Sequence, residues 1–120
     1  MGFQDNIPIY VQIADDIKNQ IVRGSLPEEE KLGSIREYSA RYQVTALTVQ
    51  RGIQLLEHQG IITTRKGVGS FVVPGARERL RREMVAGEIR SFLQKMTGMG
   101  FHDREILEMV KEEMEDDSRT

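Results

Sequence analysis

Six basic residues that lie close together in the sequence could bind a nucleic acid. They fall between residues 31 and 66, where only two acidic residues accompany them, so this stretch has a net charge of +4. The six are Lys31, Arg36, Arg41, Arg51, Arg65 and Lys66. A guanidinium group can form paired hydrogen bonds with guanine or with a phosphate. Because a local basic patch matters more for DNA binding than the charge of −2 on the whole chain, the pattern predicts a DNA-binding surface.

A helix expected over residues 45–59 carries the side chains best suited to read bases. Its outer face presents Ala46, Leu47, Gln50, Arg51 and Gln54, and its inner face presents Val49, Ile53 and Leu56. Gln50 can pair with adenine, and Arg51 can hold guanine or a phosphate. The hydroxyl groups of Thr45 and Thr48 lie at the positive end of this helix and suit a phosphate, although Thr45 also fits as a plain N-cap.

Two of the candidates have a second interpretation. Arg36 could contact DNA, or it could pair on the surface with Glu37 or Glu57. Leu47 is an apolar residue on a polar face, so it could pack on a thymine methyl group or fold back onto the preceding helix.

Two further helices are expected to precede this one. The first begins near Pro8 and ends at Gly24, with isoleucines at every fourth position along one face. The second runs from Ser34 to Tyr42, and Ser34 is followed three residues later by a glutamate, which is the spacing of a capping box.

The turn between the second and third helices is tight. Only Gln43 and Val44 lie between Tyr42 and the N-cap candidate Thr45, which predicts a helix-turn-helix. Gln43 stands where many such proteins have glycine, so we expect a non-glycine residue with positive φ there.

A β-hairpin is expected after the third helix. Residues 61–64 and 70–73 are two runs rich in β-branched residues, and the loop Arg65-Lys66-Gly67 follows the first of them. A basic side chain at such a tip can enter the minor groove of DNA; the alternative is a solvated loop. Three helices followed by a hairpin predict a winged helix-turn-helix domain over residues 1–75.

Residues 76–120 are expected to form a two-helix tail that dimerises. The apolar stripe consists of Val85, Ile89, Phe92, Leu93 and Met96 in one helix and of Ile106, Met109 and Val110 in the next. Two amphipathic helices cannot bury such a stripe alone, so we expect a homodimer interface. The alternative is packing against the chain's own first helix. Asp103 is the expected N-cap of the last helix, and a small-molecule effector could lodge between the methionine-rich helices.

Several kinds of site and function are not expected. The chain has no cysteine, which excludes disulfides, thiolate metal sites and a cysteine nucleophile. His58 and His102 are its two histidines and lack ligand spacing, so we expect no metal site, no cofactor and no catalytic residues. Without a long apolar run or a signal pattern, the chain is expected to be cytoplasmic rather than bound to a membrane.

Segments of the chain resemble the GntR family of bacterial transcription regulators. The resembling segments are residues 8–15 with Ile17-Lys18, then Lys31-Leu32, Ser34, Arg36-Glu37, Thr48-Val49, Leu56-Glu57, Gly60-Ile61-Ile62 and residues 67–72. They cover about residues 7–73 in the family's order. The short tail resembles the YtrA-type subfamily, which implies dimerisation.

The chain departs from the family pattern at a few positions. Gly33 replaces a proline, Glu28-Glu29 replaces Pro-Gly, and Ala46 replaces an arginine that contacts a base in other subfamilies. The last change puts any carried-over base preference in doubt, but not DNA binding itself.

The resemblance implies a homodimeric regulator that binds an inverted-repeat operator in duplex DNA and represses transcription, often of transporter genes. The residues expected at the DNA are Ser34, Arg36, Thr45, Ala46, Leu47, Thr48, Gln50, Arg51, Arg65, Lys66 and Gly67. The rival hypothesis is a winged-helix protein-interaction module without specific DNA readout. Ala46 favours it, as do the equal numbers of acidic and basic residues, eight of each, in residues 1–75.

Overall fold

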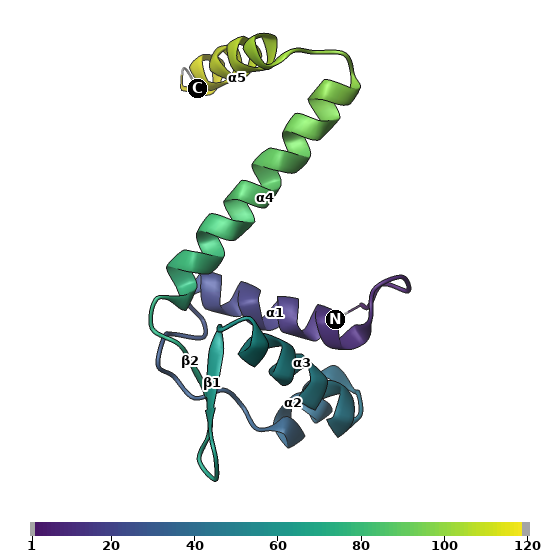
Figure 1. Cartoon of the computed structure of the whole chain (residues 1–120), viewed down its shortest axis with the longest axis vertical. Coiled ribbons are helices and arrows are strands. Elements are labelled where there is room, and N and C mark those ends of the chain that lie inside the picture. The colour runs from purple at the N-terminus through teal and green to yellow at the C-terminus, as the bar shows by residue number, and fades with distance from the viewer. Residues whose placement is uncertain (1, 119–120) are drawn as a thin grey trace. The chain divides into compact units, whose positions relative to one another are not determined.

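The computed structural model describes residues 2–118, and the chain divides into two compact units, Met1–Arg81 and Arg82–Thr120. The elements are α1 (Ile9–Arg23), α2 (Ile35–Tyr42), α3 (Ala46–His58), β1 (Ile62–Arg65), β2 (Gly69–Val72), α4 (Ala76–Gly98) and α5 (Asp103–Ser118) (Figure 1). This order confirms the predicted fold class, which is a mainly helical winged helix-turn-helix with a small hairpin, followed by two C-terminal helices.

α1 supplies one side of the core. Pro8 precedes it with φ −54°, and Gly24 ends it in the left-handed conformation with φ 85°, so both predicted ends are confirmed. Ile13 and Ile17 have no exposed surface, whereas Ile9 at the start of the predicted stripe is 40% exposed.

The helix-turn-helix has the predicted caps. Ser34 and Glu37 form a complete capping box at the start of α2, and the Thr45 side chain accepts the Thr48 N–H at the start of α3. Gln43 has φ 56° and ψ 50°, which confirms the left-handed residue expected in the turn. Its N–H donates to the Ser39 carbonyl and closes α2.

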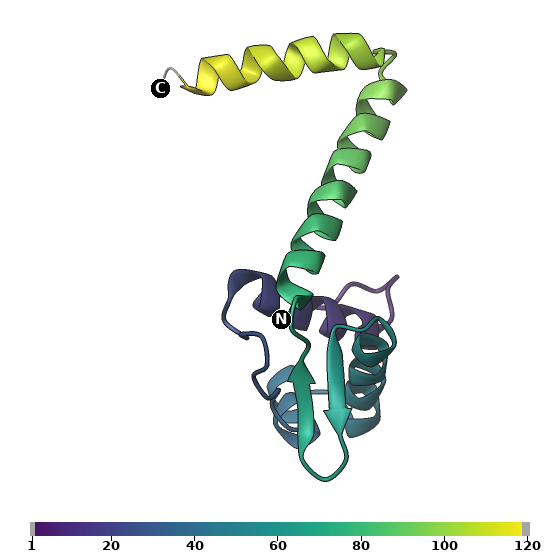
Figure 2. The ribbon, with the colours of Figure 1, turned by 60° about the vertical axis from the view of Figure 1, so that its left-hand side comes forward.

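The hairpin is shifted by one residue from the prediction. β1 and β2 pair antiparallel with Ile62 opposite Val72 and Arg65 opposite Gly69 (Figure 2). This register draws Arg65 and Gly69 into the strands, so the expected strands 61–64 and 70–73 were each wrong by one residue.

A third segment joins the hairpin, which the sequence did not predict. The N–H of Glu29 donates to the Val72 carbonyl, and the N–H of Leu32 donates to the Ser70 carbonyl, both at 2.8 Å. Residues 29–32 therefore pair with the free side of β2.

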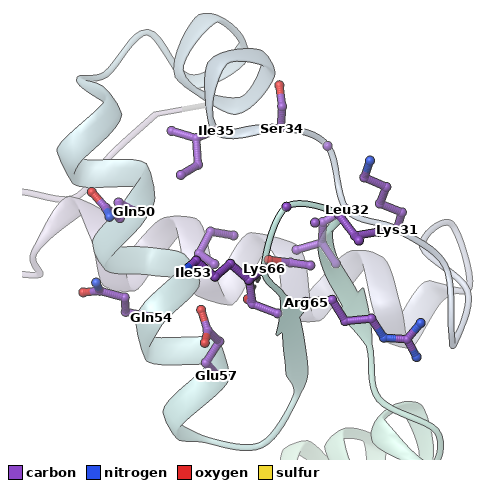
Figure 3. Close-up of a pocket in the computed structure, with 16 residues that line it drawn as sticks. Lys31, Leu32, Ser34, Ile35, Gln50, Ile53, Gln54, Glu57, Arg65 and Lys66 are labelled. Carbon is purple, nitrogen blue, oxygen red and sulfur yellow. Dashed lines mark hydrogen bonds between the residues drawn. The ribbon is translucent and has the colours of Figure 1, made fainter.

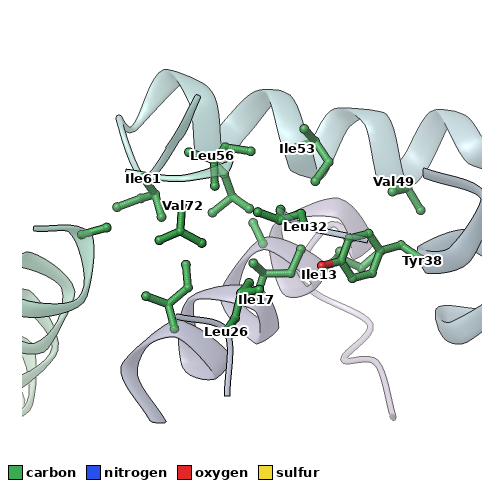
Figure 4. Close-up of a cluster of buried hydrophobic side chains, with 14 of the residues drawn as sticks. Ile13, Ile17, Leu26, Leu32, Tyr38, Val49, Ile53, Leu56, Ile61 and Val72 are labelled. Atoms are coloured by element: carbon green, nitrogen blue, oxygen red, sulfur yellow. The ribbon is translucent and has the colours of Figure 1, made fainter. Parts of the chain in front are cut away.

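The core of the first unit lies between α1, α3 and the hairpin (Figure 4). Its most deeply buried side chains are Ile13, Ile17, Ile21, Val49, Leu56, Ile61 and Val72. α1 approaches α3 closely at Gly52, where an added Cβ would lie 3.1 Å from the Tyr10 carbonyl oxygen. Removal of this apolar surface from water is the main stabilising contribution to the unit.

The second unit consists of α5 and the part of α4 after Arg81. Asp103 is the first residue of α5 rather than its N-cap, so that prediction was wrong by one residue. His102 precedes the helix: its carbonyl accepts the Ile106 N–H, and its own N–H donates to the Glu105 carboxylate. Within residues 2–118, every helix is either too short or too polar to span a lipid bilayer.

Candidate nucleic-acid interface

A groove of about 430 Å³ runs between α3, the hairpin and the start of α2 (Figure 3). Its polar lining includes Lys31, Ser34, Gln50, Gln54, Glu57 and Lys66. Because three elements distant in sequence contribute to it, the groove exists only in the folded unit. It brings together five of the predicted site residues, which are Ser34, Gln50, Arg65, Lys66 and Gly67.

The outer face of α3 is exposed, as the sequence predicted. Val49 and Leu56 are fully buried, whereas Ala46, Gln50 and Arg51 are exposed on the other side. Leu47 is 57% exposed, so it does not fold back onto α2. An exposed apolar side chain beside polar ones can make the contact with a thymine methyl group that its position suggested.

At the start of α3, two threonine hydroxyl groups cap the helix and can still form further hydrogen bonds. The Thr45 oxygen accepts the Thr48 N–H at 3.3 Å, and the two hydroxyl groups lie 3.0 Å apart. A hydroxyl has one donor and two acceptor positions, so both threonines keep capacity for a further partner. The cap is confirmed, and the phosphate contact stays a prediction.

The side chains of Arg36 and Arg51 are exposed and make no hydrogen bond or ion pair with any residue in the described part of the chain. Neither alternative pairing of Arg36, with Glu37 or with Glu57, occurs among the described residues, and the Glu37 carboxylate instead accepts the Ser34 N–H at 3.2 Å. This hydrogen bond lowers the pKa of Glu37, and Arg41 and Lys31 lower it further. Both arginines are therefore available to an external anion.

The hairpin tip presents its two cations in different ways. The Arg65 guanidinium lies 5.0 Å from the centre of the Phe71 ring, in a cation–π contact that holds it on the strand. Lys66 and Gly67 are exposed at the tip itself, where Gly67 has φ 77° and open space around its Cα. At the tip, the positive charge of Arg65 is thus held in one orientation, whereas that of Lys66 is unrestrained.

Lys31 and Glu57 also line the groove; Lys31 belongs to the predicted basic set, whereas the sequence did not place Glu57 at the site. Lys31 lies on the segment that pairs with β2, and its stem crosses Gly69 so closely that an added Cβ would lie 2.5 Å from the Lys31 Cε. Glu57 follows Gln50 and Gln54 on the same face of α3. Glu57 lies at i+7 from Gln50, with Gln54 at i+4, and this helical spacing was the sequence signal that could have identified Glu57.

Gly33, which departs from the family pattern, has a local role. Its N–H donates to the Tyr38 hydroxyl at 3.3 Å, a bond that proline could not make. Tyr38 stacks on Tyr42, whose hydroxyl donates to Asp16 at 2.6 Å, and burial raises the pKa of Tyr42. These contacts tie the start of α2 and its last residue to α1.

Most of the predicted dimer residues are exposed in the single chain. Val85 is 57% exposed and Ile89 is 52% exposed, and Phe92 and Leu93 are also exposed. Met96, Met109 and Val110 are partly exposed. Ile106 differs from the rest because it is 2% exposed, so it packs inside the second unit and offers little surface to a partner.

Comparison with known proteins gives relatives along nearly the whole chain. The family model described as "Bacterial regulatory proteins, gntR family" matches residues 9–72. The HTH-type transcriptional regulator YhcF of Bacillus subtilis is 36% identical over 115 residues, which cover 91% of this chain and 92% of the relative. The HTH-type transcriptional repressor YtrA of the same species is 26% identical over 112 residues, which cover 91% of this chain and 86% of the relative.

Solved structures of transcription regulators also superpose on this chain. A GntR family transcriptional regulator from Listeria monocytogenes superposes with a TM-score of 0.80 and 31% identity, over 92% of this chain and 98% of that one. The DNA-binding domain of AraR in complex with its operator ORX1 superposes with a TM-score of 0.57 and 26% identity, over 60% of this chain and 93% of that one.

Proposed function

This chain belongs to the GntR family of bacterial regulatory proteins, whose members are DNA-binding transcription regulators and not enzymes, and we propose that it acts as a homodimeric repressor on an inverted-repeat operator. The observation that carries the proposal is the exposed face of α3 beside the groove and the basic hairpin tip. Unpaired cations and amide side chains on one surface suit a phosphate backbone and base edges.

In the proposed complex, α3 enters the major groove and the hairpin tip lies over the adjacent minor groove. Gln50 and Arg51 read base edges, with Leu47 against a thymine methyl group. Ser34, Thr45 and Thr48 bind phosphates, and Ala46 allows a close approach. Arg36 contacts a base or a phosphate. Arg65, Lys66 and Gly67 follow the minor groove.

The proposed dimer forms through the second unit. The stripe of Val85, Ile89, Phe92 and Leu93 is exposed on α4, and contiguous exposed apolar residues mark interaction sites. A two-fold axis between two copies requires two half-sites of opposite direction, about one helical turn apart. In this proposal, residues 1–75 bind DNA, and the tail of residues 76–120 dimerises through its part after Arg81.

The cellular role follows from the resemblance to the YtrA type. We place the protein in that subfamily, as a cytoplasmic repressor whose targets include transporter genes. Likeness to a repressor of that name over 91% of the chain supports this assignment. A small-molecule effector bound by the second unit would be an addition to this function.

Selection of bound duplexes from a random pool, at low and at moderate salt, tests the proposal. We expect an enriched inverted repeat that survives moderate salt, bound by two chains in sedimentation analysis. Gln50→Ala should relax the preference at one position of each half-site by about 1–3 kcal/mol. Gln94→Ala, which removes an exposed amide on α4, is the matched control and should change nothing.

Weak binding without sequence preference that disappears at moderate salt would refute specific readout, because it would reflect only phosphate contacts. That result would favour the protein-interaction module. The acidic Glu57 in the groove would then be the first residue to examine for a contact with a basic protein partner.

A further inference from the structure

Two arginines in the first turn of α4 hold the carboxyl ends of α1 and α3. Arg77 Nε donates to the Val22 carbonyl at 2.9 Å, and Arg79 Nη2 donates to the Gln59 carbonyl at 2.5 Å. Carbonyl groups in the last turn of a helix lack partners within the helix and attract positive charge. Each arginine therefore completes one helix end of the first unit.

A glycine lies beside each arginine at these two helix ends. Gly24 and Gly60 have φ 85° and 72°, and each follows the end of its helix. An added Cβ would lie 3.7 Å from Arg77 Nη2 at Gly24 and 3.4 Å from Arg79 Nη1 at Gly60. The guanidinium groups thus lie directly beside the two turns that end α1 and α3.

The same turn of α4 is also fixed by packing. Ala76 and Leu80 are each 2% exposed in the core of the first unit. The Arg77 N–H donates to the Glu28 carboxylate at 3.2 Å. Residues 76–80, which we term the α4 anchor, are therefore held by two apolar side chains and by hydrogen bonds to three other segments.

We propose that the α4 anchor determines which spacing of operator half-sites the dimer accepts. This inference rests on the proposed function, because it requires a dimer that reads two half-sites. The anchor attaches α4 to α3, the same helix that is proposed to enter the major groove. The first turn of α4, where the chain leaves the first unit, is then held at the end of the reading helix. If the first turn of α4 could move relative to α3, the dimer would reach half-sites at several separations. If it cannot move, the dimer favours a single separation.

The test compares the natural chain with Arg77→Met/Arg79→Met, which keeps most of the apolar stems and removes both donors. The control is Arg81→Met, because Arg81 pairs with Glu78 of its own helix at 4.0 Å. The probes are the inverted repeat enriched by selection, the same repeat with one, two or five base pairs inserted at its centre, and a duplex with one half-site.

We expect the natural chain and Arg81→Met to bind the original repeat more tightly than the lengthened ones. In the double variant, the ratio of the affinity for the original repeat to that for the lengthened repeats should fall about fivefold. This loss is smaller than removal of a buried charged hydrogen bond would cause, because both guanidinium groups are exposed. Its affinity for the single half-site should stay unchanged, because the anchor lies outside the proposed reading surface. Hydrogen exchange at the amides of residues 79–83 should become faster, which shows that the anchor has loosened.

An unchanged spacing preference in a variant with faster exchange would refute the inference. An equal loss of affinity for the single half-site would also refute it, because that result indicates general destabilisation. If the double variant does not fold, the single variants Arg77→Met and Arg79→Met carry the same comparison. A pool without any enriched repeat would refute the proposed function and this inference together, whereas an enriched repeat with unchanged spacing preference refutes the inference alone.

Discussion

Replacing Arg36 by glutamine should reveal whether this residue binds a phosphate or reads a base. Arg36 is exposed and has no partner in the described part of the chain, so its loss should leave the unbound protein intact. A dimer loses two cations through this substitution. If both contact phosphates, the slope of log affinity against log salt concentration should become shallower by about 1.8, since each contact contributes about 0.9.

This change is large enough to measure. Between 50 and 200 mM salt, the natural dimer should lose about twelvefold more affinity than Arg36→Gln if both arginines contact phosphates. If Arg36 reads guanine instead, the loss should be confined to operators that carry that base, at about 1–3 kcal/mol for each half-site. Fluorescence anisotropy with the selected operator and with substituted versions, at four salt concentrations, measures both effects.

The matched control is Lys111→Gln, which removes a cation that pairs with Glu108 on α5 at 3.9 Å. It should leave the slope unchanged. If Arg36→Gln behaves like this control in both slope and base preference, Arg36 does not contact DNA, and the reasoning from its exposure is refuted.

Three further substitutions test other parts of the structure. Gln43→Gly should stabilise the first unit by about 0.5–1 kcal/mol, measured by chemical denaturation. The reason is that relief of the left-handed backbone strain at φ 56° exceeds the conformational entropy that glycine adds to the unfolded chain. A loss of stability would contradict this. Ile89→Lys should convert the dimer to monomers in sedimentation analysis, whereas the control Arg90→Ser on the same helix should not. A dimer that stays intact in Ile89→Lys would rule out the apolar stripe of α4 as the interface. Gly69→Ala should destabilise by about 1–3 kcal/mol, chiefly because alanine rarely adopts φ 143°, with a smaller contribution from its Cβ at 2.5 Å from Lys31 Cε. Lys31→Ala should recover part of that loss, and the absence of recovery would show that the backbone strain alone is responsible.

The elements set by local chemistry could be predicted from the sequence. Gly24 and the Ser34–Glu37 pair act on the backbone within a few residues, so their pattern is visible without a structure. The buried face of α3 followed from helical spacing, and it placed Gln50 and Arg51 outside. The exposed half of the candidate site could be inferred for the same reason.

The parts that depend on distant backbone groups could not be predicted. The third segment pairs with β2 through N–H and carbonyl groups, which every residue carries, so Glu29 and Glu30 give no sign of it. Arg77 and Arg79 look like ordinary charges of a helix start, because their acceptors lie 55 and 20 residues away in sequence. Gln12 likewise gives no sequence signal that it holds the chain before α1, where it accepts the Gln4 N–H at 2.8 Å.

The segment that pairs with β2 also bears on how fast DNA could be recognised. A two-stranded hairpin alone is only marginally stable in water, whereas a third paired segment with a covered apolar face can hold it in one conformation. The hydrogen bonds from Glu29 and Leu32 to the Val72 and Ser70 carbonyls supply that third segment before any ligand arrives. The hairpin therefore need not lose conformational entropy at the moment of binding. Encounter with DNA should then be limited by diffusion and orientation rather than by folding of the hairpin.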